Sequence, residues 1–465
     1  MKRMHLALIA YLSASCTALA QDELGLLEIY ELALFNDPAI REAEASFLAT
    51  SEIKRQARSG LLPSIALSGS QSDSTTTSDN PPDPVTGQPN PFALSTEADS
   101  DSRNLSINLS QTVFDWGALL SLKQSDKTIA RAEIDLASTQ QDLMIRVATA
   151  YFTVLAAEDL LAANVAAREA LSQQLEQTQR RFDVGLIAIT NVQEAQAGYD
   201  TAVADVISSE RTLATAQESL REIVNEYITD LKTPIEELPL QSPNPEDVDR
   251  WVDIAQGQNL ALVASRLNAD IAQDDIRIAR SVRFPTLSLS ASESDRSSTS
   301  TTTIIPAPGF PAPPGSGVPR DSGAEGAAVS LSLSMPIFTG GFNRSRIQQS
   351  VYRHRAAMEA VERISRQTER LTRDAYLGVT SEISRVQALS QALESTRTAL
   401  LATQAGEEVG QRTAVDVVNA QNSVRRAETT YAGARYDYLM NILRLKQAAG
   451  SLAEADLAEI DGWLE

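Results

Sequence analysis

The sequence predicts a mainly α-helical chain that also carries membrane β-strands, arranged as two tandem repeats. Three observations predict this fold class. Short segments recur in the second half in the same order, the hydrophobic period alternates between helix and strand, and each half holds one very long helical run without proline. We therefore expect a long α-helical coiled-coil barrel and four strands per chain, which contribute to a shared twelve-stranded trimeric β-barrel.

The internal repeat defines the domain organisation. Segment 61–68 (LLPSIALS) recurs as 283–290 (RFPTLSLS), and segment 113–117 (VFDWG) is matched by 337–341 (IFTGG). Between the copies, four prolines over 233–247 exclude a regular helix. The predicted domains are a signal peptide over 1–20, a first repeat over 21–232, a proline-rich linker or equatorial segment over 233–247, a second repeat over 248–455 and a C-terminal tail over 456–465.

Each repeat is expected to contain a helix, two strands, a long helix and a further helix. Asn36 and Asp37 cap the opening helix ahead of Pro38. In the strand segments apolar residues alternate with small polar ones, which suits a wall between lipid and water. The expected bounds are strands at about 61–73 and 103–114 and helices at about 118–184 and 190–230, then strands at about 283–296 and 325–338 and helices at about 342–409 and 413–449.

The segments between paired strands, 74–102 and 298–323, are rich in Ser, Thr, Pro and Asp and are predicted to be external loops. The long helices carry narrow, alanine-rich apolar stripes that are typical of coiled-coil seams. One stripe repeats every seven residues through Ile129, Leu136 and Leu143, and the other steps by threes and fours through Val361, Ile364, Thr368, Leu371, Ala375 and Gly378.

The composition excludes several classes of function. A basic start, an apolar run and the triplet 18–20 (ALA) predict a secretory signal peptide, whose removal would take away Cys16, the only cysteine. Lipidation of Cys16 is a less favoured alternative, because Ser13 stands where a lipid-attachment site prefers leucine. With 61 acidic and 40 basic residues, the net charge of −21 repels nucleic acid. No catalytic motif or Cys/His cluster is present, so we expect no enzyme activity, metal site or cofactor.

Beyond the signal peptide, no apolar stretch approaches the roughly 20 residues of a membrane-spanning helix. Four strands cannot close a barrel in lipid, and each unpaired edge group would cost several kcal/mol. Two copies would make a filled barrel and three a barrel with a lumen. Serines and Asn108 on the polar face favour the lumen, and hence a homotrimer in lipid. Trp116 and Phe338 suit an interfacial girdle, although aromatics capping a soluble core are equally compatible.

Two segments resemble the helix-turn-helix tips of TolC-type outer-membrane efflux and secretion channels. They are 181–192 (RFDVGLIAITNV) and 409–417 (VGQRTAVDV), and 434–441 (ARYDYLMN) is similar to the last long helix of that family. The resemblance covers essentially the whole mature chain. Physically, a glycine suits the left-handed position that ends each long helix. A threonine, Thr190 or Thr413, would cap the next helix.

The resemblance implies a gate at these tips. Arg412 would be the donor of a latch with Thr190 and Asn191 as partners, and Asp416 would form a constriction ring that attracts cations. This chain departs from the family pattern at three places, where Asn191 replaces a latch aspartate, Glu407 a latch tyrosine and Asn419 the second ring aspartate. An adaptor would dock on Val184, Gly185, Leu186, Val409, Gly410 and Gln411.

Two alternatives concern single residues of this gate. Glu407 could pair with Arg412 in place of the missing aspartate. Asp416 could instead serve as the acid of a capping box, because it follows Thr413 by three residues in the first turn of a helix.

The resemblance further implies a passive exit duct of a tripartite efflux or type I secretion system. Its partners would be a periplasmic adaptor and an inner-membrane pump, either a proton-driven exporter or an ABC transporter. The location would be the outer membrane of a Gram-negative bacterium, with the helices in the periplasm. Two alternatives remain from other classes. One is a trimeric surface adhesin, which keeps its four strands together at the C-terminus, and the other is a periplasmic coiled-coil scaffold without membrane contact.

Overall fold

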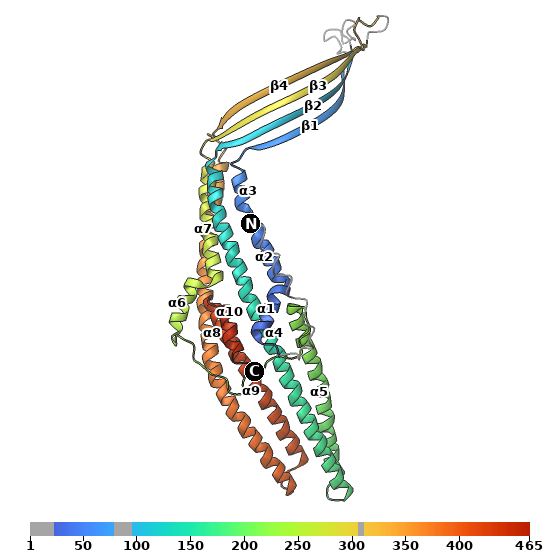
Figure 1. Ribbon diagram of the computed structural model, residues 1–465, viewed down its shortest axis with the longest axis vertical. Coiled ribbons are helices and arrows are strands. Elements are labelled where there is room, and N and C mark those ends of the chain that lie inside the picture. The colour runs from blue at the N-terminus through green and yellow to red at the C-terminus, as the bar shows by residue number, and fades with distance from the viewer. Residues whose placement is uncertain (1–22, 79–94, 306–310) are drawn as a thin grey trace, which may run out of the picture. The chain divides into compact units, whose positions relative to one another are not determined.

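The computed structural model describes residues 23–78, 95–305 and 311–465. The predicted signal peptide and the centre of the first predicted loop lie outside these residues. The elements in chain order are α1 (Leu26–Asn36), α2 (Pro38–Ser51), α3 (Ile53–Ser59), β1 (Ser64–Ser78), β2 (Ser95–Phe114), α4 (Trp116–Asp183), α5 (Ile189–Val224), α6 (Val248–Gln258), α7 (Leu260–Ser281), β3 (Thr286–Ile305), β4 (Pro319–Ser334), α8 (Phe342–Glu408), α9 (Ala414–Ala449) and α10 (Glu454–Asp461) (Figure 1).

The chain divides into two compact units. The helical unit comprises Met1–Phe47, Arg131–Arg266 and Met358–Glu465, and the sheet unit comprises Leu48–Ala130 and Leu267–Ala357. Each unit draws on both sequence repeats, because the long helices α4 and α8 contribute to both. The two units are described separately below.

The sheet unit contains one antiparallel sheet with the strand order β1-β2-β3-β4 (Figure 1). Because successive side chains along a strand point to opposite sides, the two faces of the sheet carry different kinds of side chain. Serines of neighbouring strands bond to each other on one face, as in Ser68–Ser106 at 2.8 Å and Ser290–Ser330 at 2.7 Å. The other face exposes apolar side chains, namely Ile65, Leu67, Leu105, Ile107, Val329, Leu331 and Leu333.

The strands extend further than their apolar segments predict. In the structure the strands include four polar segments that the sequence predicts to be loops, namely 74–78, 95–102, 298–305 and 319–323. The extension has a physical cause in cross-strand hydrogen bonds between polar side chains. Thr75 donates to Asp99 at 2.6 Å and Thr299 donates to Asp321 at 2.8 Å. The four strands remain paired through these polar segments, which therefore need no apolar core at this end, and their threonines have high strand propensity.

The helical unit has a continuous core around the middle of α4. Leu143, Val147 and Leu155 of α4 are almost fully buried, together with Leu220 of α5 and Leu443 of α9. One 18-residue window of α4 has a mean hydropathy of 1.3, which is apolar enough for a membrane-spanning helix and corrects the expectation that no such stretch follows the signal peptide. Of this window, 39% is buried in the core, where each buried leucine contributes about 1.5–3 kcal/mol.

Two local predictions about this unit have clear outcomes. Asp37 caps α2, because its carboxylate accepts the N–H of Ala39 at 2.5 Å, and the buried carboxylate also pairs with Arg146 at 2.8 Å.

Where the sequence predicts a C-terminal tail over 456–465, the structure instead has α10. Leu457 and Ile460 of α10 are buried in the core, so tertiary packing stabilises a helix too short to be stable alone.

The apolar stripe of α8 also differs from the prediction. Within the helical unit the buried residues of α8 include Thr372, Val379, Val386 and Leu393, at intervals of seven, whereas Leu371 of the predicted stripe is 42% exposed. Thr368 alone of the predicted set is buried. A step of threes and fours does not distinguish neighbouring stripes on a helix when both are lined by small residues.

Candidate gate at the helical tips

Two tight turns join the long helices of the helical unit, α4 to α5 and α8 to α9. Gly185 and Gly410 have φ values of 79° and 75°, the left-handed conformation that glycine adopts without strain. In the first turn the Leu186 N–H donates to the Arg181 carbonyl at 2.9 Å, and in the second the Gln411 N–H donates to the Gly406 carbonyl at 2.8 Å. These bonds satisfy the last carbonyls of each long helix, which confirms the predicted role of both glycines.

The residues around the turns are exposed, as docking would require. The relative exposures of the two valines, Val184 and Val409, are both 70%, and that of Leu186 is 73%. Nothing lies within 4 Å of a side chain built at Gly185 or Gly410. The two turns therefore present apolar side chains to solvent within the single chain.

The caps of the two return helices differ from each other. At α9 the Asp416 N–H donates to Thr413 Oγ1 at 3.2 Å and the Thr413 N–H donates to Asp416 Oδ2 at 2.9 Å, which together form a capping box. At α5 the prediction that Thr190 caps the helix is wrong. The capping position falls on Ala188, which makes no side-chain bond, and Thr190 is the second residue of the helix, two residues past that position.

The capping box also sets the charge state of Asp416. The backbone hydrogen bond from Thr413, followed by the bond from its hydroxyl and the charge of Arg412, lowers the pKa of the Asp416 carboxyl below its usual value. The carboxylate is therefore ionised at neutral pH and engaged in the cap within the chain. Asn419, one turn further along α9, is exposed.

Glu407 forms an ion pair that the sequence analysis does not predict. Arg181 Nη1 of α4 lies 2.6 Å from Glu407 Oε1 of α8, and their side chains are 33% and 13% exposed. The alternative pairing of Glu407 with Arg412 is therefore not the one in the structure. The two partners are far apart in sequence, so only the packing of the two helical hairpins brings them together. The position of Arg181 in the last turn of α4 is its only local signal.

Arg412 has no such partner among the residues that the structure describes. Its N–H donates to the Gly406 carbonyl at 3.1 Å, and its side chain lies against Gly406. Among the described residues, its guanidinium donates no hydrogen bond and forms no ion pair, and the side chains of Thr190 and Asn191 make none with it. The guanidinium of Arg412 and the side chains of Thr190 and Asn191 can therefore bond to groups outside this chain.

A second tie joins the two hairpins away from the tips. Arg425 of α9 donates to Asn164 Oδ1 of α4 at 2.6 Å and pairs with Asp205 Oδ2 of α5 at 3.1 Å. An open cavity of about 320 Å³ lies beside it, between α4, α5 and α9. These residues are not recognisable from the sequence, because a single arginine in a polar helix face carries no short-range signal.

The described residues contain no group of three or more His, Cys, Asp or Glu side chains that could hold a metal ion. The chemistry of the site is therefore that of turns, caps and ion pairs. Each of these is a reversible contact between helices, and none of the gate side chains is arranged as a nucleophile with a base.

Residues 29–226 and 251–451 match the family model described as outer membrane efflux protein. The chain is 33% identical over 468 residues to the outer membrane protein TolC of Escherichia coli, covering 100% of this chain and 90% of that protein. It is 27% identical over 436 residues to the alkaline protease secretion protein AprF of Pseudomonas aeruginosa, covering 93% of this chain and 86% of that protein.

Solved structures share the fold. The CmeC outer membrane channel of Campylobacter jejuni superposes with a TM-score of 0.71 at 15% identity, covering 95% of this chain and 90% of that one. The open state of the MtrE outer membrane channel of Neisseria gonorrhoeae superposes with a TM-score of 0.66 at 19% identity, covering 95% and 94%. At these identities the likeness concerns the fold alone.

Proposed function

The chain belongs to the outer membrane efflux protein family, and from this premise we propose that it is the exit duct of a tripartite efflux or type I secretion system. Membership makes it an outer-membrane efflux or secretion channel, and the relatives are channels rather than enzymes. The finer proposal is a passive homotrimer that crosses the outer membrane as a twelve-stranded barrel and continues into the periplasm as a helical barrel.

One observation carries this proposal, the amphipathic sheet of the sheet unit. It exposes apolar side chains on one face and serines on the other, and β1 and β4 each have one neighbouring strand within the described chain. In lipid the free edges of such a sheet need partners, because unpaired backbone groups are costly there. Further copies of the same chain supply those edges with matching geometry, and three copies leave a polar lumen.

The gate is proposed to use two kinds of contact at the tips. Arg412, whose guanidinium has no hydrogen-bond or ion-pair partner in the described part of the chain, would reach Thr190 and Asn191 of a neighbouring copy. Arg181 and Glu407 would hold the two hairpins of one copy together. Three copies would also bring the Asp416 carboxylates close to one another, so that the capping residue becomes a ring that attracts cations. Asn419 would add a neutral ring in place of a second charged one.

The exposed turns are proposed to receive a periplasmic adaptor. Apolar side chains that are 70% or more exposed, such as Val184, Leu186 and Val409, are expected at a binding surface. The energy for transport would come from an inner-membrane pump, either a proton-driven exporter or an ABC transporter. The TolC and AprF relatives are named for the outer membrane and for protease secretion, which is compatible with drug or protein cargo.

Fractionation and electrical recording test the proposal. The protein should be recovered from the outer membrane as a trimer that resists mild detergent, and the trimer should form discrete ion-conducting channels in planar bilayers. Recovery of a folded monomer from the soluble periplasm would overturn the duct and favour a coiled-coil scaffold. Channel formation without any binding of an adaptor would leave a pore but overturn the tripartite assignment.

A further inference from the structure

A cavity of about 520 Å³ opens in the sheet unit where the strands give way to helices. Its walls come from the starts of α4 and α8, the end of α7 and the adjoining strand ends. Two kinds of side chain meet there. The polar wall includes Arg346 and Arg353 of α8, and the apolar wall includes Phe284 and Val282 after α7.

The two arginines are available to a ligand. They are seven residues apart on α8, which is about two turns, so they project from one side of the helix. Both are exposed, and within the described part of the chain neither guanidinium donates a hydrogen bond or forms an ion pair. The cavity therefore presents two sets of guanidinium donors that the protein itself does not use.

The acidic residues of the same cavity are engaged differently. Asp115 Oδ1 accepts the N–H groups of Gly117 and Ala118 at 2.7 and 3.2 Å and so caps α4. Asp275 Oδ1 accepts Nε2 of Gln124 at 2.7 Å. Both carboxylates serve the packing of the helices, whereas the two guanidinium groups make no hydrogen bond or ion pair with any described residue.

Helix stability does not account for the arginines. The first turns of α8 carry Arg344 and Arg346 and no acidic residue, although the positive end of a helix favours acidic side chains. The described segment 342–358 contains four arginines and no Asp or Glu, in a chain with 61 acidic and 40 basic residues. Such a local excess of cations points to an anion supplied from outside the chain.

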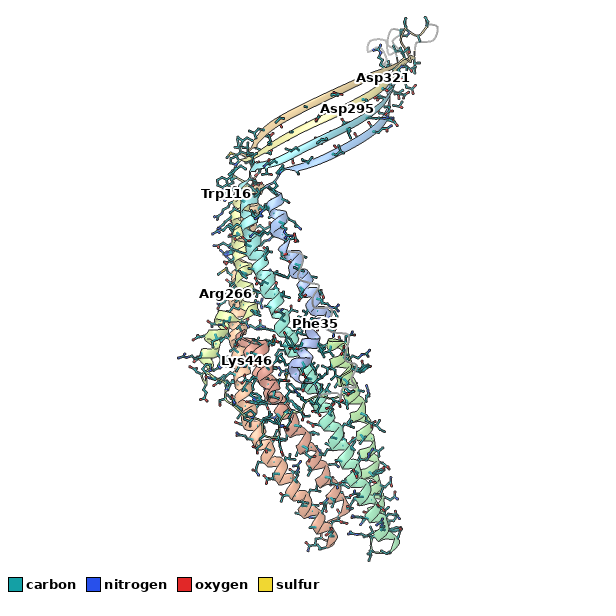
Figure 2. The ribbon with its side chains drawn as sticks, in the orientation of Figure 1. Phe35, Trp116, Arg266, Asp295, Asp321 and Lys446 are labelled. Carbon is teal, nitrogen blue, oxygen red and sulfur yellow. The ribbon has the colours of Figure 1, made fainter. Side chains whose placement is uncertain are left out.

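The surroundings of the cavity specify what kind of anion fits. Ile337 and Phe338 directly follow the cavity residue Pro336 and are 95% and 87% exposed, and Phe342 at the start of α8 is 65% exposed. Trp116, labelled in Figure 2 where the strands meet the helices, packs against Phe284 with ring centroids 6.5 Å apart. An aromatic and apolar rim beside paired guanidinium groups matches an amphiphile with a phosphate head and acyl chains.

We propose that this cavity binds the phosphate headgroup of an anionic glycerophospholipid from the membrane leaflet at the helical end of the sheet, through Arg346 and Arg353. The inference rests on the proposed function in one respect, namely that the sheet crosses the membrane. Guanidinium groups bind phosphate oxygens with two parallel hydrogen bonds. The acyl chains would lie along the rim formed by Ile337, Phe338 and Phe342.

Thermal unfolding of the full-length protein, purified in a neutral detergent, tests this site. The added probes are short-chain phosphatidylglycerol, phosphatidylcholine of the same chain length, and inorganic phosphate. Phosphatidylglycerol should raise the midpoint of unfolding more than the other two. The variant R346Q/R353Q should bind phosphatidylglycerol at least about tenfold more weakly, because it loses both charged donors.

The matched control is R344Q/R355Q, which removes two exposed arginines of the same helix that do not line the cavity. This control should keep the response of the wild type. If both variants lose the phosphatidylglycerol-induced rise of the unfolding midpoint equally, the effect comes from the general positive charge of the helix and the site is overturned. If inorganic phosphate raises the wild-type midpoint as much as phosphatidylglycerol does, a lipid ligand is overturned. A lower unfolding midpoint of R346Q/R353Q in lipid-free detergent would identify a neighbouring copy as the partner and would also overturn the proposal.

The outcome is separable from that of the proposed function. Single-channel conductance of R346Q/R353Q should equal that of the wild type, because the cavity lies outside the gate residues. A wild-type protein that binds phosphatidylglycerol but forms no channel would refute the duct and keep the lipid site. A conducting wild type without selectivity for phosphatidylglycerol would refute the lipid site and keep the duct.

Discussion

The ion pair between Arg181 and Glu407 gives the sharpest test of the gate. The substitution Glu407→Gln keeps the size of the side chain and one oxygen that accepts a hydrogen bond, and it removes the negative charge. If the pair holds α4 and α8 together in the closed state, its loss should favour the open state. The expected readout is a larger open probability of single channels in planar bilayers.

The magnitude follows from the geometry of the pair. The atoms are 2.6 Å apart, and the side chains are 33% and 13% exposed, so the pair is neither fully solvated nor fully buried. A hydrogen bond to a charged group contributes about 1.5–3 kcal/mol, and a neutral one about 0.5–1.5 kcal/mol. The substitution should therefore cost about 1 kcal/mol in the closed state, which is about a fivefold change in the ratio of open to closed channels.

The assay includes a matched control on α4, the helix that carries Arg181. Arg180 and Glu176 form an exposed pair within α4, with side chains 75% and 64% exposed. Glu176→Gln removes the same charge near the tip without touching the contact between hairpins, so its open probability should stay at the wild-type value. Raising the salt concentration should increase the open probability of the wild type more than that of Glu407→Gln, because salt screens only an existing pair.

Two results would refute this reasoning. One is an unchanged open probability for Glu407→Gln, which would mean that the pair persists in both states or that the hairpins do not separate. The other is a failure of the exchanged pair R181E/E407R to restore the wild-type value when either single reversal perturbs it. In that case the effect of each single change would come from its own helix and not from the contact.

Three further predictions concern the tips. Arg412→Ala or Arg412→Ser should raise single-channel conductance, because it removes the proposed latch donor, and an unchanged conductance would exclude Arg412 from the latch. Asp416→Ala should weaken block by multivalent cations and increase hydrogen exchange in the first turn of α9. Because the folded pKa of Asp416 is lowered, its stabilising effect should be present above the unfolded pKa and lost as pH falls through the folded value; protection factors in the first turn of α9 that do not fall with pH would contradict this. Gly410→Ala should destabilise the α8–α9 turn by about 1–2 kcal/mol because of its left-handed backbone, measured as faster exchange at the end of α8, whereas Gly433→Ala in α9 should have no such effect.

Much of the fold is predictable from the sequence because its signals are local or periodic. The repeat places both strand pairs and both long helices, and a change of hydrophobic period marks where each begins. Gly185, Gly410 and the box of Thr413 with Asp416 are predictable for the same reason, since a left-handed turn and a helix cap depend on a few consecutive residues. The polar ends of the strands cannot be predicted in this way, because they lack the alternation of apolar and polar residues that marks a strand.

The tertiary structure decided which distant residues meet. The pairing of Arg181 with Glu407, the tie from Arg425 to Asn164 and Asp205, and the choice of the buried stripe in α8 all depend on the rotation of one helix against another. The same is true of α10, whose two buried side chains find their partners in helices far earlier in the chain. Sequence patterns describe each element along its own axis, whereas these contacts depend on relative rotation and offset, which only the packing of the whole chain determines.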